Sequence, residues 1–307
     1  MGRLVVYGHV NVDHIVHVAD IPKTDHTVAI KSTEMLWGGT AGNIVACAAS
    51  LGTPVSVAAY IGRGFPDAYR RHLETLGVGL DHLVQTDDHD TPAWWGYIAP
   101  NGDTIGFVEQ GPMGRMTEYP PLLAPLDDAD VVHFATGHPK AWIPVAKEAK
   151  KRGKTVVTDP GQELSQLYDA TTLEAMLEAA DIAFFNRVEM EHALDLLKYG
   201  APEQLFDHDL ELVVETRGAD GALLHTEAGT IEVPAVLVPR AEVVDPTGAG
   251  DAFRAGFHSA RLDGMDAEQA ARFGSACAAL VIRTKGGQGT LPKRPDVERL
   301  LSKPARA

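Results

Sequence analysis

Cysteine is scarce in this sequence, and long apolar runs are absent from it. The only cysteines among the 307 residues are Cys47 and Cys277, which lie in separate alanine-rich stretches. A disulfide framework or a cysteine-rich metal site needs more cysteines at closer spacing, so we expect two buried free thiols. No apolar run reaches the roughly 18 residues of a membrane span. The N-terminus lacks a signal-peptide cleavage pattern, and the sequence therefore predicts a soluble, cytoplasmic protein.

Basic residues are also in short supply. The chain carries 27 lysines and arginines against 42 aspartates and glutamates, for a formal net charge of −15. Non-specific binding to nucleic acid needs a basic surface, so this class of function is excluded. A phosphorylated ligand is still compatible with the acidic chain, because backbone amides, local basic groups or a metal can neutralise it.

What the sequence does contain is a regular alternation of apolar strands and amphipathic helices. Strands are expected at residues 4–10, 55–62, 131–137, 155–160, 182–186 and 210–218. Helices are expected at residues 66–77, 140–153 and 172–181. This order predicts βαβ units around a mostly parallel sheet, whose strand ends carry ligand-binding loops. The length suits one large α/β domain or two smaller ones.

Residues 12–36 and 91–110 break the alternation, because both are extended and lack a helical pattern. Within the second segment, Asn101-Gly102 separates two alternating apolar stretches, which is a strong signal for a β-hairpin. The two segments together predict a small accessory sheet. That sheet is either a decorative edge or a lid over the ligand-binding edge of the main sheet.

The stretch DPTGAGDAF, residues 245–253, places glycines directly before a helix expected at residues 251–262. Unpaired amides and the helix dipole at such an N-terminus favour negative charge, as on a transferring phosphoryl group. Asp251 could accept the proton of an attacking hydroxyl as a general base, or it could simply cap the helix. The stretch is not a Walker A loop, since the Lys-Ser/Thr ending is missing.

The longer stretch DPTGAGDAFRAGF resembles the C-terminal signature of the PfkB (ribokinase-like) family of carbohydrate and nucleoside kinases. Four further stretches are similar to motifs of that family and occur in its order: GHVNVD (8–13), WGGTAGNIVACAASLG (37–52), FFNRVE (184–189) and ETRGADGALL (215–224). The resemblance implies a ribokinase-like three-layer α/β sandwich with a mostly parallel central sheet and a small β-sheet lid. It further implies a single domain over residues 1–307, with the lid formed by residues 12–36 and 91–110, and an ATP-dependent kinase that uses Mg²⁺.

The resemblance also implies roles for individual residues. Asp251 would be the general base, and the amides of Gly248, Ala249 and Gly250 would form an anion hole. Asp13 would end the first strand and accept hydrogen bonds from two adjacent sugar hydroxyls. A plain turn aspartate at the strand end is the alternative for Asp13.

Other matched residues would bind substrate or metal. Gly38 and Gly39 would allow the lid to hinge and the substrate to approach the backbone. Asn43 would bind another hydroxyl or cap its helix. Glu189 would hold water around Mg²⁺, unless it is only a first-turn glutamate favoured by the helix dipole.

The nucleotide would be bound by five further residues, the last two near its base: Asn186, Thr216, Gly218, Gly286 and Gly287. Asp245 and Thr247 match positions that bind a monovalent cation such as K⁺ in some relatives, and a turn role is the alternative. The chain departs from the family at two places: it has Arg63 where an aspartate is common, and Asp159-Pro160-Gly161 in place of Asp-Pro-Asn. Gly161 lacks a side chain that could bind phosphate or metal, and Arg63 is expected at the surface.

Members of the family usually phosphorylate a primary hydroxymethyl group. Asp13, Asn43 and the diglycine suggest a ribose-type acceptor, either the free sugar or a nucleoside. Since neighbouring strand residues face opposite ways, only one of Trp94 and Trp95 can face a ligand. That indole, or Trp37, could stack on a nucleobase, form the lid core or contact a second subunit.

Two alternative functions stay open. A kinase of a sugar phosphate such as ribose 1-phosphate would need converging basic groups, for which there are five candidates: Lys23, Lys31, Arg63, Arg115 and Lys140. A regulator that binds a sugar or nucleoside without catalysis would not need Asp251. A dinucleotide oxidoreductase is disfavoured, because no G-x-G-x-x-G follows the first strand.

The lid is also expected to form a homodimer. Its alternating strands would present an apolar face containing Val16, Val18, Val28, Ile30 and one of the paired tryptophans. An apolar face of this kind needs cover, and two lids packed about a two-fold axis would supply it.

Overall fold

The structure, a computed structural model, describes residues 2–302. Its centre is a nine-stranded sheet with the order β13-β12-β11-β10-β9-β8-β1-β4-β5. The strands are β1 (Leu4–Tyr7), β4 (Val55–Arg63), β5 (Gly79–Asp90), β8 (Val131–Phe134), β9 (Thr155–Thr158), β10 (Ile182–Asn186), β11 (Leu212–Thr216), β12 (Ala222–Thr226) and β13 (Gly229–Val233). Neighbours run parallel except at β11–β12 and β12–β13, so the predicted mostly parallel sheet is confirmed.

Side chains alternate between two hydrophobic layers along the central strand. In β1, Leu4 and Val6 pack into one buried cluster, and Val5 and Tyr7 pack into the other. A parallel sheet that is covered on both faces requires such continuously apolar strands. This explains why the strands were visible in the sequence as short uninterrupted apolar runs.

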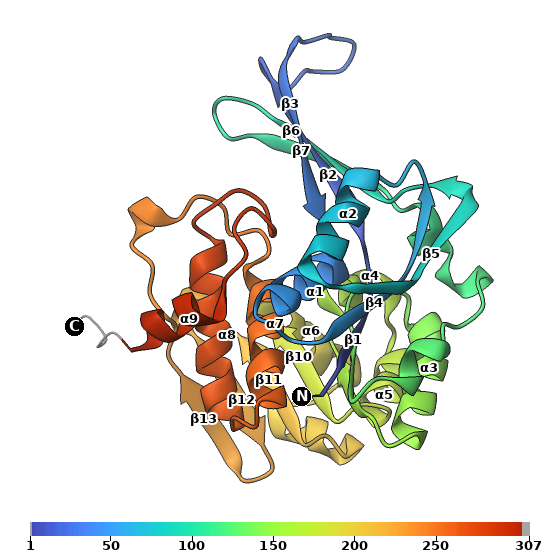
Figure 1. The fold of residues 1–307 in the computed structure, drawn as a ribbon, viewed down its shortest axis with the longest axis vertical. Coiled ribbons are helices and arrows are strands. Elements are labelled where there is room, and N and C mark those ends of the chain that lie inside the picture. The colour runs from blue at the N-terminus through green and yellow to red at the C-terminus, as the bar shows by residue number, and fades with distance from the viewer. Residues whose placement is uncertain (1, 303–307) are drawn as a thin grey trace.

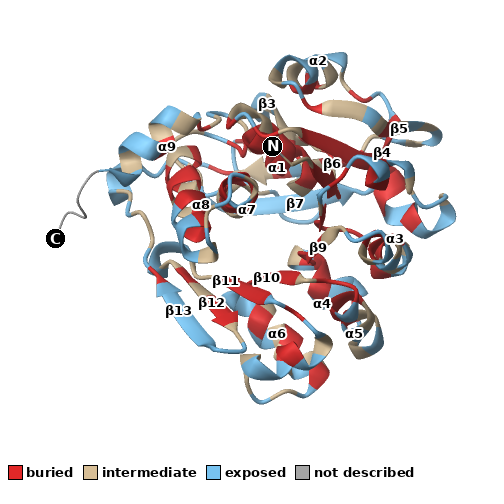
Figure 2. Ribbon diagram, turned by 60° about the horizontal axis from the view of Figure 1, so that its bottom comes forward, coloured by how far each residue is buried: buried red, intermediate tan, exposed pale blue. Residues whose placement is uncertain are grey.

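Helices cover both faces of this sheet and complete three layers (Figure 1). One layer contains α1 (Thr40–Ser50), α2 (Asp67–Leu76), α7 (Ala249–Leu262), α8 (Ala267–Val281) and α9 (Arg294–Leu301). The other contains α3 (Pro139–Lys151), α4 (Leu164–Leu167), α5 (Ala170–Glu178) and α6 (Arg187–Leu197). Figure 2 shows buried residues concentrated on the central strands and on the helices packed beside them. The predicted three-layer sandwich is confirmed.

Six short 3-10 helices lie in the connections: η1 (Gly111–Glu118), η2 (Ala124–Asp127), η3 (Gly161–Glu163), η4 (Pro202–His208), η5 (Gly218–Asp220) and η6 (Arg240–Glu242). The helices expected at residues 66–77, 140–153 and 172–181 correspond to α2, α3 and α5, with boundaries shifted by one to three residues. Shifts of this size are ordinary at helix ends, which fray and differ between definitions.

A second, four-stranded sheet projects from the body and forms the lid (Figure 1). Its order is β3-β2-β6-β7, with β2 (Asn11–Val18), β3 (Ile30–Gly38), β6 (Ala93–Ile98) and β7 (Thr104–Glu109). The hairpin predicted at Asn101-Gly102 is confirmed: β6 and β7 pair antiparallel, and Gly102 has a φ of 91°. Positive φ is the reason that the turn uses glycine.

The prediction for Asp13 needs a correction. The first strand was expected to run over residues 4–10 and to end near Asp13, but β1 stops at Tyr7. Asp13 is the third residue of β2, where it pairs with Leu36 and Trp94 of the lid sheet. The chain passes from the main sheet to the lid sheet after β1, because β2 pairs with strands that are distant in the sequence. Local sequence does not reveal this pairing.

Two predictions about the chain as a whole can be compared with the structure. Cys47 and Cys277 are both free and buried, as expected. Within residues 2–302, no helix combines the length and the apolar character that crossing a lipid bilayer demands.

Candidate active site

A cavity of about 340 Å³ lies between the carboxyl edge of the central sheet and the inner face of the lid. The strand order reverses beside β1, which has β4 on one side and β8 on the other, and ligands of α/β proteins bind at such a switch point. The cavity is lined by eight residues that the sequence singled out: Asp13, Gly39, Asn43, Trp94, Asp245, Thr247, Asp251 and Gly286.

Asp251 and Asn43 meet at this cavity from two different helices. Asn43 Nδ2 donates a hydrogen bond of 2.8 Å to Asp251 Oδ2. The N-cap of α7 is Gly248 and that of α1 is Gly39, and neither helix start has a side-chain cap. The alternative that Asp251 and Asn43 are helix caps is therefore wrong.

The environment of Asp251 alters its acidity. Burial raises the pKa of Asp251 to about 6, although the Arg254 guanidinium and the Asn43 amide both favour the carboxylate. A carboxyl with a pKa close to working pH can accept and release a proton readily, which suits a general base.

The glycine run before Asp251 is shaped by both its backbone and its neighbours. Gly248 has a φ of 79°, and a Cβ on it would lie 2.3 Å from the Gly287 Cα. The Ala249 amide donates to the Pro246 carbonyl at 3.1 Å. Gly250 follows in the first turn of α7, where amides have no carbonyl one helical turn back and can bind an anion.

Asp13 faces the cavity together with a residue that the sequence analysis missed. Asn11 lies two positions earlier on β2, and its Nδ2 donates to Asp13 Oδ1 at 2.6 Å. Burial raises the pKa of Asp13 to about 6; the hydrogen bond from Asn11 opposes this, and the Asp251 and Asp245 charges reinforce it. Residues two apart on a strand share a face, and this signal could have identified Asn11.

Gly38 and Gly39 lie where the lid meets α1, and neighbouring residues pack closely against both. A Cβ on Gly38 would come within 2.5 Å of Asp13 Oδ2. Gly39 has a φ of 91°, and a Cβ there would lie 2.3 Å from the His9 carbonyl oxygen. Neither position can hold a side chain, because Asp13 and the His9 backbone lie against these two glycines.

The three lid tryptophans have three different environments. Trp94 lines the cavity, and its indole lies across two glycines: a Cβ on Gly96 would be 2.1 Å from Trp94 Cη2, and one on Gly106 would be 2.9 Å from Nε1. Trp95 lies on the opposite face and stacks on His14, with ring centroids 3.8 Å apart. Trp37 stacks on Tyr69 at the base of the lid. Only Trp94 of the adjacent pair faces the cavity.

Asp245 joins two loops beside the cavity. Its Oδ1 accepts from the Thr247 amide at 2.9 Å, and its Oδ2 accepts from the Gly286 amide at 2.8 Å. Although burial opposes the charge, these amides lower the pKa of Asp245 below its ordinary value. Next to Gly286, Lys285 Nζ contacts both carboxylate oxygens of Glu34 on β3, at 3.0 and 3.2 Å. This ion pair connects the loop to the lid.

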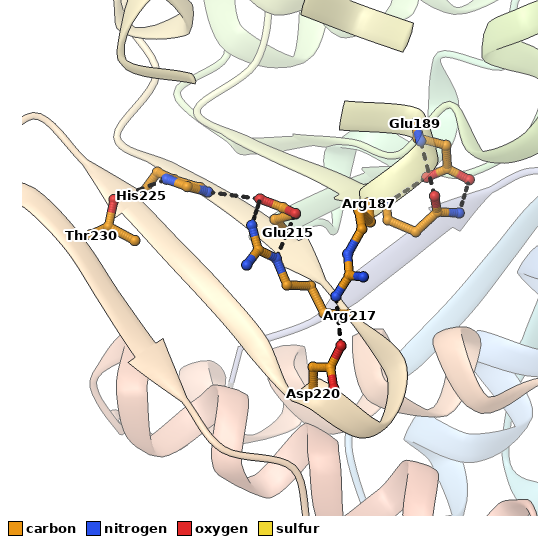
Figure 3. A network of polar contacts seen from close by, with 8 residues as sticks. Arg187, Glu189, Glu215, Arg217, Asp220, His225 and Thr230 are labelled. Atoms are coloured by element: carbon orange, nitrogen blue, oxygen red, sulfur yellow. Dashed lines mark hydrogen bonds and ion pairs between the residues drawn. The ribbon is translucent and has the colours of Figure 1, made fainter. Parts of the chain in front are cut away.

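Three of the five residues predicted to bind nucleotide, Asn186, Thr216 and Gly218, lie at or just after the ends of β10 and β11, where Asn186 is the register partner of Thr216. The other two, Gly286 and Gly287, lie in the loop after α8, and Gly286 lines the cavity beneath the lid. Asn186 caps α6: its Oδ1 accepts from the Glu189 amide, while Glu189 accepts from both the backbone and the side chain of Asn186 (Figure 3). The first-turn role of Glu189 is thus realised in the structure. Gly218 has a φ of 58° in the turn that follows β11.

The same close-up shows a network that the sequence did not predict. Buried Glu215 accepts two hydrogen bonds from Arg217, at 2.7 and 3.1 Å, and lies 3.2 Å from His225 Nε2. Arg187 Nη2 donates to Asp220 at 2.6 Å (Figure 3). These contacts brace the turn that contains Gly218.

A magnesium ion is implied by the family resemblance, and the site can be tested for it. Among residues 2–302, no group of three or more His, Cys, Asp or Glu side chains could hold a metal ion. Mg²⁺ usually keeps several waters and takes one or two carboxylates plus substrate phosphates. Burial and the Asp159 charge raise the pKa of Glu189, so a cation nearby would stabilise its carboxylate. Glu189 fits a water-mediated contact.

Lysine and arginine side chains are missing from the described cavity wall, although His9 lines it. Arg63 pairs with Asp90 at 2.9 Å and is largely exposed, as expected. Arg115 pairs with Glu118, and Lys140 lies at a different cavity beside α3. Of the residues that line the cavity between sheet and lid, all in the described part of the chain, none is a lysine or an arginine.

A partly buried carboxylate at a glycine-rich helix start, beneath a lid, suits transfer of a phosphoryl group to a small alcohol. The chain belongs to the pfkB family of carbohydrate kinases, whose family model matches residues 1–294, and it is a sugar or nucleoside kinase of that family.

Three relatives illustrate the range of that family. The nucleoside kinase of Methanocaldococcus jannaschii is 31% identical over 305 residues, covering 99% of this chain and 98% of that protein. Its crystal structure aligns with a TM-score of 0.90 at 30% identity, over 99% of each chain. The ATP-dependent ribose-1-phosphate kinase of Halopiger xanaduensis is 31% identical over 290 residues, 94% of each chain. The ribokinase of Arabidopsis thaliana, complexed with ribose and ATP, has a TM-score of 0.84 at 26% identity over 99% of each chain.

Proposed function

We propose that the protein transfers the γ-phosphoryl group of ATP to the primary hydroxymethyl group of a ribonucleoside. One observation carries the choice of a nucleoside: the cavity has a flat indole on its lid side and no lysine or arginine in its wall. An indole can stack on a nucleobase, whereas a phosphorylated acceptor calls for an arginine or lysine.

Asn11 and Asp13 hold the sugar in this proposal. The Asp13 carboxylate accepts hydrogen bonds from adjacent ribose hydroxyls, and the Asn11 amide that already donates to Oδ1 fixes its orientation. Gly38 and Gly39 bring the lid backbone close to Asp13 and to His9 beside this sugar site. A free ribose would use these contacts as well but would leave Trp94 without a partner.

Asp251 takes the proton at the other end of the acceptor. As the hydroxyl oxygen forms its bond to phosphorus, the proton passes to the Asp251 carboxylate, and the electron pair of the broken bond leaves on the β-phosphate oxygen of ADP. Amides in the first turn of α7 stabilise the charge that develops on the transferring group. When bound, ATP supplies the phosphoryl group and Mg²⁺ offsets phosphate charge.

The nucleotide and cation assignments rest on placement. Asn186, Thr216 and Gly218 lie at adjacent strand ends, and the Arabidopsis ribokinase of the same fold holds ATP. Glu189 would contact Mg²⁺ through water. Asp245 and Thr247 would bind K⁺ through their oxygens, and the hydrogen bond from the Thr247 amide to Asp245 is also what a simple turn role would produce.

A homodimer through the lid is also part of the proposal. The face of the lid opposite Asp13 exposes four apolar side chains: Met35 (49%), Trp95 (37%), Ile105 (39%) and Phe107 (60%). Val16 and Val18, expected in an exposed face, are instead buried. A second copy would cover this outer face about a two-fold axis.

An acceptor screen tests the proposed activity. Ribonucleosides, ribose and ribose 1-phosphate are each supplied with ATP and Mg²⁺, and acceptor-dependent ADP release is measured, with Asp251→Asn as the control for background hydrolysis. We expect kcat/KM to be highest for a nucleoside. A preference for ribose 1-phosphate or free ribose would overturn the proposal.

A further inference from the structure

Arg254 is a buried cation one helical turn beyond Asp251. Among residues 2–302 it is the only buried lysine or arginine, with 7% of its surface exposed. Arginine is almost never buried without a partner, because desolvating its charge is costly. The position on α7 is three residues after Asp251 and four after Gly250, so its side chain runs back toward the start of the helix.

Asp159 supplies that partner. Arg254 Nη2 donates to Asp159 Oδ1 at 2.6 Å, and Arg254 Nε contacts Asp159 Oδ2. Burial alone would raise the pKa of Asp159, yet the Arg254 charge and His133 lower it below its ordinary value. The guanidinium also lies over the Phe184 ring, 5.6 Å from its centroid.

Two buried histidines follow Asp159 in a row: His133 lies beside Asp159, and His258 lies beside His133. His133 Nε2 lies 3.4 Å from Asp159 Oδ2, and His133 Nδ1 is 3.0 Å from His258 Nε2. Burial lowers the pKa of both imidazoles, so both are neutral at pH 7. With the His133 proton on Nε2, facing Asp159, His133 Nδ1 is an acceptor, and His258 Nε2 donates to it. Each neutral imidazole then needs only one N–H.

Nη1 is the guanidinium nitrogen of Arg254 that does not contact Asp159. Nη1 forms no hydrogen bond with any residue in the range 2–302, and a Cβ on Gly250 would lie 2.7 Å from it. It therefore lies against the first turn of α7, the turn that binds the transferring group in the proposed reaction. Despite burial, the charges of Asp159, Glu189 and Asp251 raise the pKa of Arg254, so it stays protonated throughout.

We propose that Arg254 Nη1 donates a hydrogen bond to the phosphoryl group during transfer, and that Asp159 is the positioning residue that aims it. This inference rests on the proposed kinase reaction and names a further catalytic residue for it. It also accounts for Gly161, which leaves this loop without a side chain to bind phosphate. A lysine could not replace Arg254, because one ammonium cannot bind Asp159 twice and present a separate donor.

Two variants separate this role from a purely structural one. Arg254→Lys keeps a charge beside Asp159 but loses Nη1. The double variant Asp159→Asn/Arg254→Gln removes both charges together, which leaves no unpaired buried ion. Both are expected to lose about 10²–10³-fold in kcat, the typical effect of one lost donor to a transition-state anion, with acceptor KM changed by less than about threefold. Full kcat in the double variant would show that the pair serves only folding.

A binding measurement gives a readout that does not depend on the acceptor. Aluminium fluoride with ADP and Mg²⁺ mimics a phosphoryl group in flight, and calorimetry can compare it with ADP and Mg²⁺ alone. Wild-type protein should bind ADP more tightly with fluoride present, and the double variant should lose that gain but keep its affinity for ADP. An equal gain in both proteins would overturn the role of Arg254. A wild-type protein that phosphorylates no nucleoside would overturn the proposed function alone.

Discussion

Asn43 Nδ2 donates its hydrogen bond to Asp251 Oδ2 across the contact between α1 and α7. The orientation of the Asn43 amide is itself set, because Gln288 Nε2 donates to Asn43 Oδ1 at 3.1 Å. Oδ2 of Asp251 is therefore occupied, and Oδ1 is the oxygen left to take a proton from substrate. Asn43, which could pass for a helix cap in the sequence, is thus an oriented partner of the proposed general base.

Activity should fall steeply below about pH 6. Asp251 and Asp13 both have a pKa of about 6, and both act as carboxylates in the proposed reaction. Protonation of either one stops catalysis, so log(kcat/KM) should rise with a slope approaching two below pH 6 and flatten above it. Initial rates from pH 5 to 8 measure this. A flat profile through pH 6 would contradict the assignment of both carboxylates.

Asp251→Asn should lose about 10²–10⁴-fold in kcat, because an amide cannot accept the hydroxyl proton. Binding of nucleoside and ATP should change little, since the Asn43 amide can still donate to the new side-chain oxygen. Quenched-flow or steady-state ADP release gives kcat, and calorimetry gives the two affinities. Near wild-type kcat would rule out Asp251 as the base.

The same substitution should stabilise the fold at neutral pH. The folded-state pKa of Asp251 is raised, so the folded protein binds the proton more tightly than the unfolded chain does. Stability therefore decreases as pH rises from about 4 to about 6, by up to roughly 3 kcal/mol for a shift of about two units. Asp251→Asn should raise Tm at pH 7.5 and change it much less near pH 4. An unchanged Tm at pH 7.5 would contradict the cost of burying this charge.

Asp13→Ala should act on the acceptor. It removes charge-assisted hydrogen bonds worth roughly 1.5–3 kcal/mol, so acceptor KM should rise about tenfold or more. The proposed ATP site at the ends of β10 and β11 belongs to the main sheet and not to the lid sheet that contains β2, so KM for ATP should stay near wild type. Equal losses for both substrates would indicate a general structural defect in place of a lost acceptor contact.

Trp94 and Trp95 form a matched pair for testing the nucleobase contact and the dimer. Trp94→Leu should raise nucleoside KM, with stacking worth about 0.5–1.5 kcal/mol beyond burial, and leave any ribose activity unchanged. Trp95→Glu should leave KM unchanged but weaken the dimer, because Trp95 lies on the outer face of the lid. Light scattering at micromolar concentration should show twice the chain mass for wild type. A monomeric wild type would exclude the lid dimer.

The parts of the fold that local patterns determine were predictable. The strands β4 and β10 are continuous apolar runs because helices cover both faces of the sheet, and the lid hairpin carries its Asn-Gly turn in plain view. The glycines around Gly248 indicated that something approaches this backbone closely. In the structure, Gly287 lies directly against Gly248.

Other features depend on contacts between distant segments. Asp13 lies inside β2 and not at the end of β1, because β2 pairs with β3 and β6, and no local pattern records that pairing. Period two predicted that at most one of Trp94 and Trp95 can face a ligand, but only the register with Asp13 places Trp94 on the cavity side. No sequence pattern singled out Arg254, because its burial depends on Asp159, which is 95 residues away.

The indole of Trp94 rests on two positions that have no side chain at all, Gly96 and Gly106. Its tilt therefore depends on residues that a bound molecule would never touch. A single methyl group at either glycine would push the ring and reshape the cavity while every contacting residue stayed the same. Substitutions at Gly96 and Gly106 can therefore change acceptor preference without changing any residue that contacts the acceptor. A mutant library built to alter acceptor preference should vary positions 96 and 106 before Trp94.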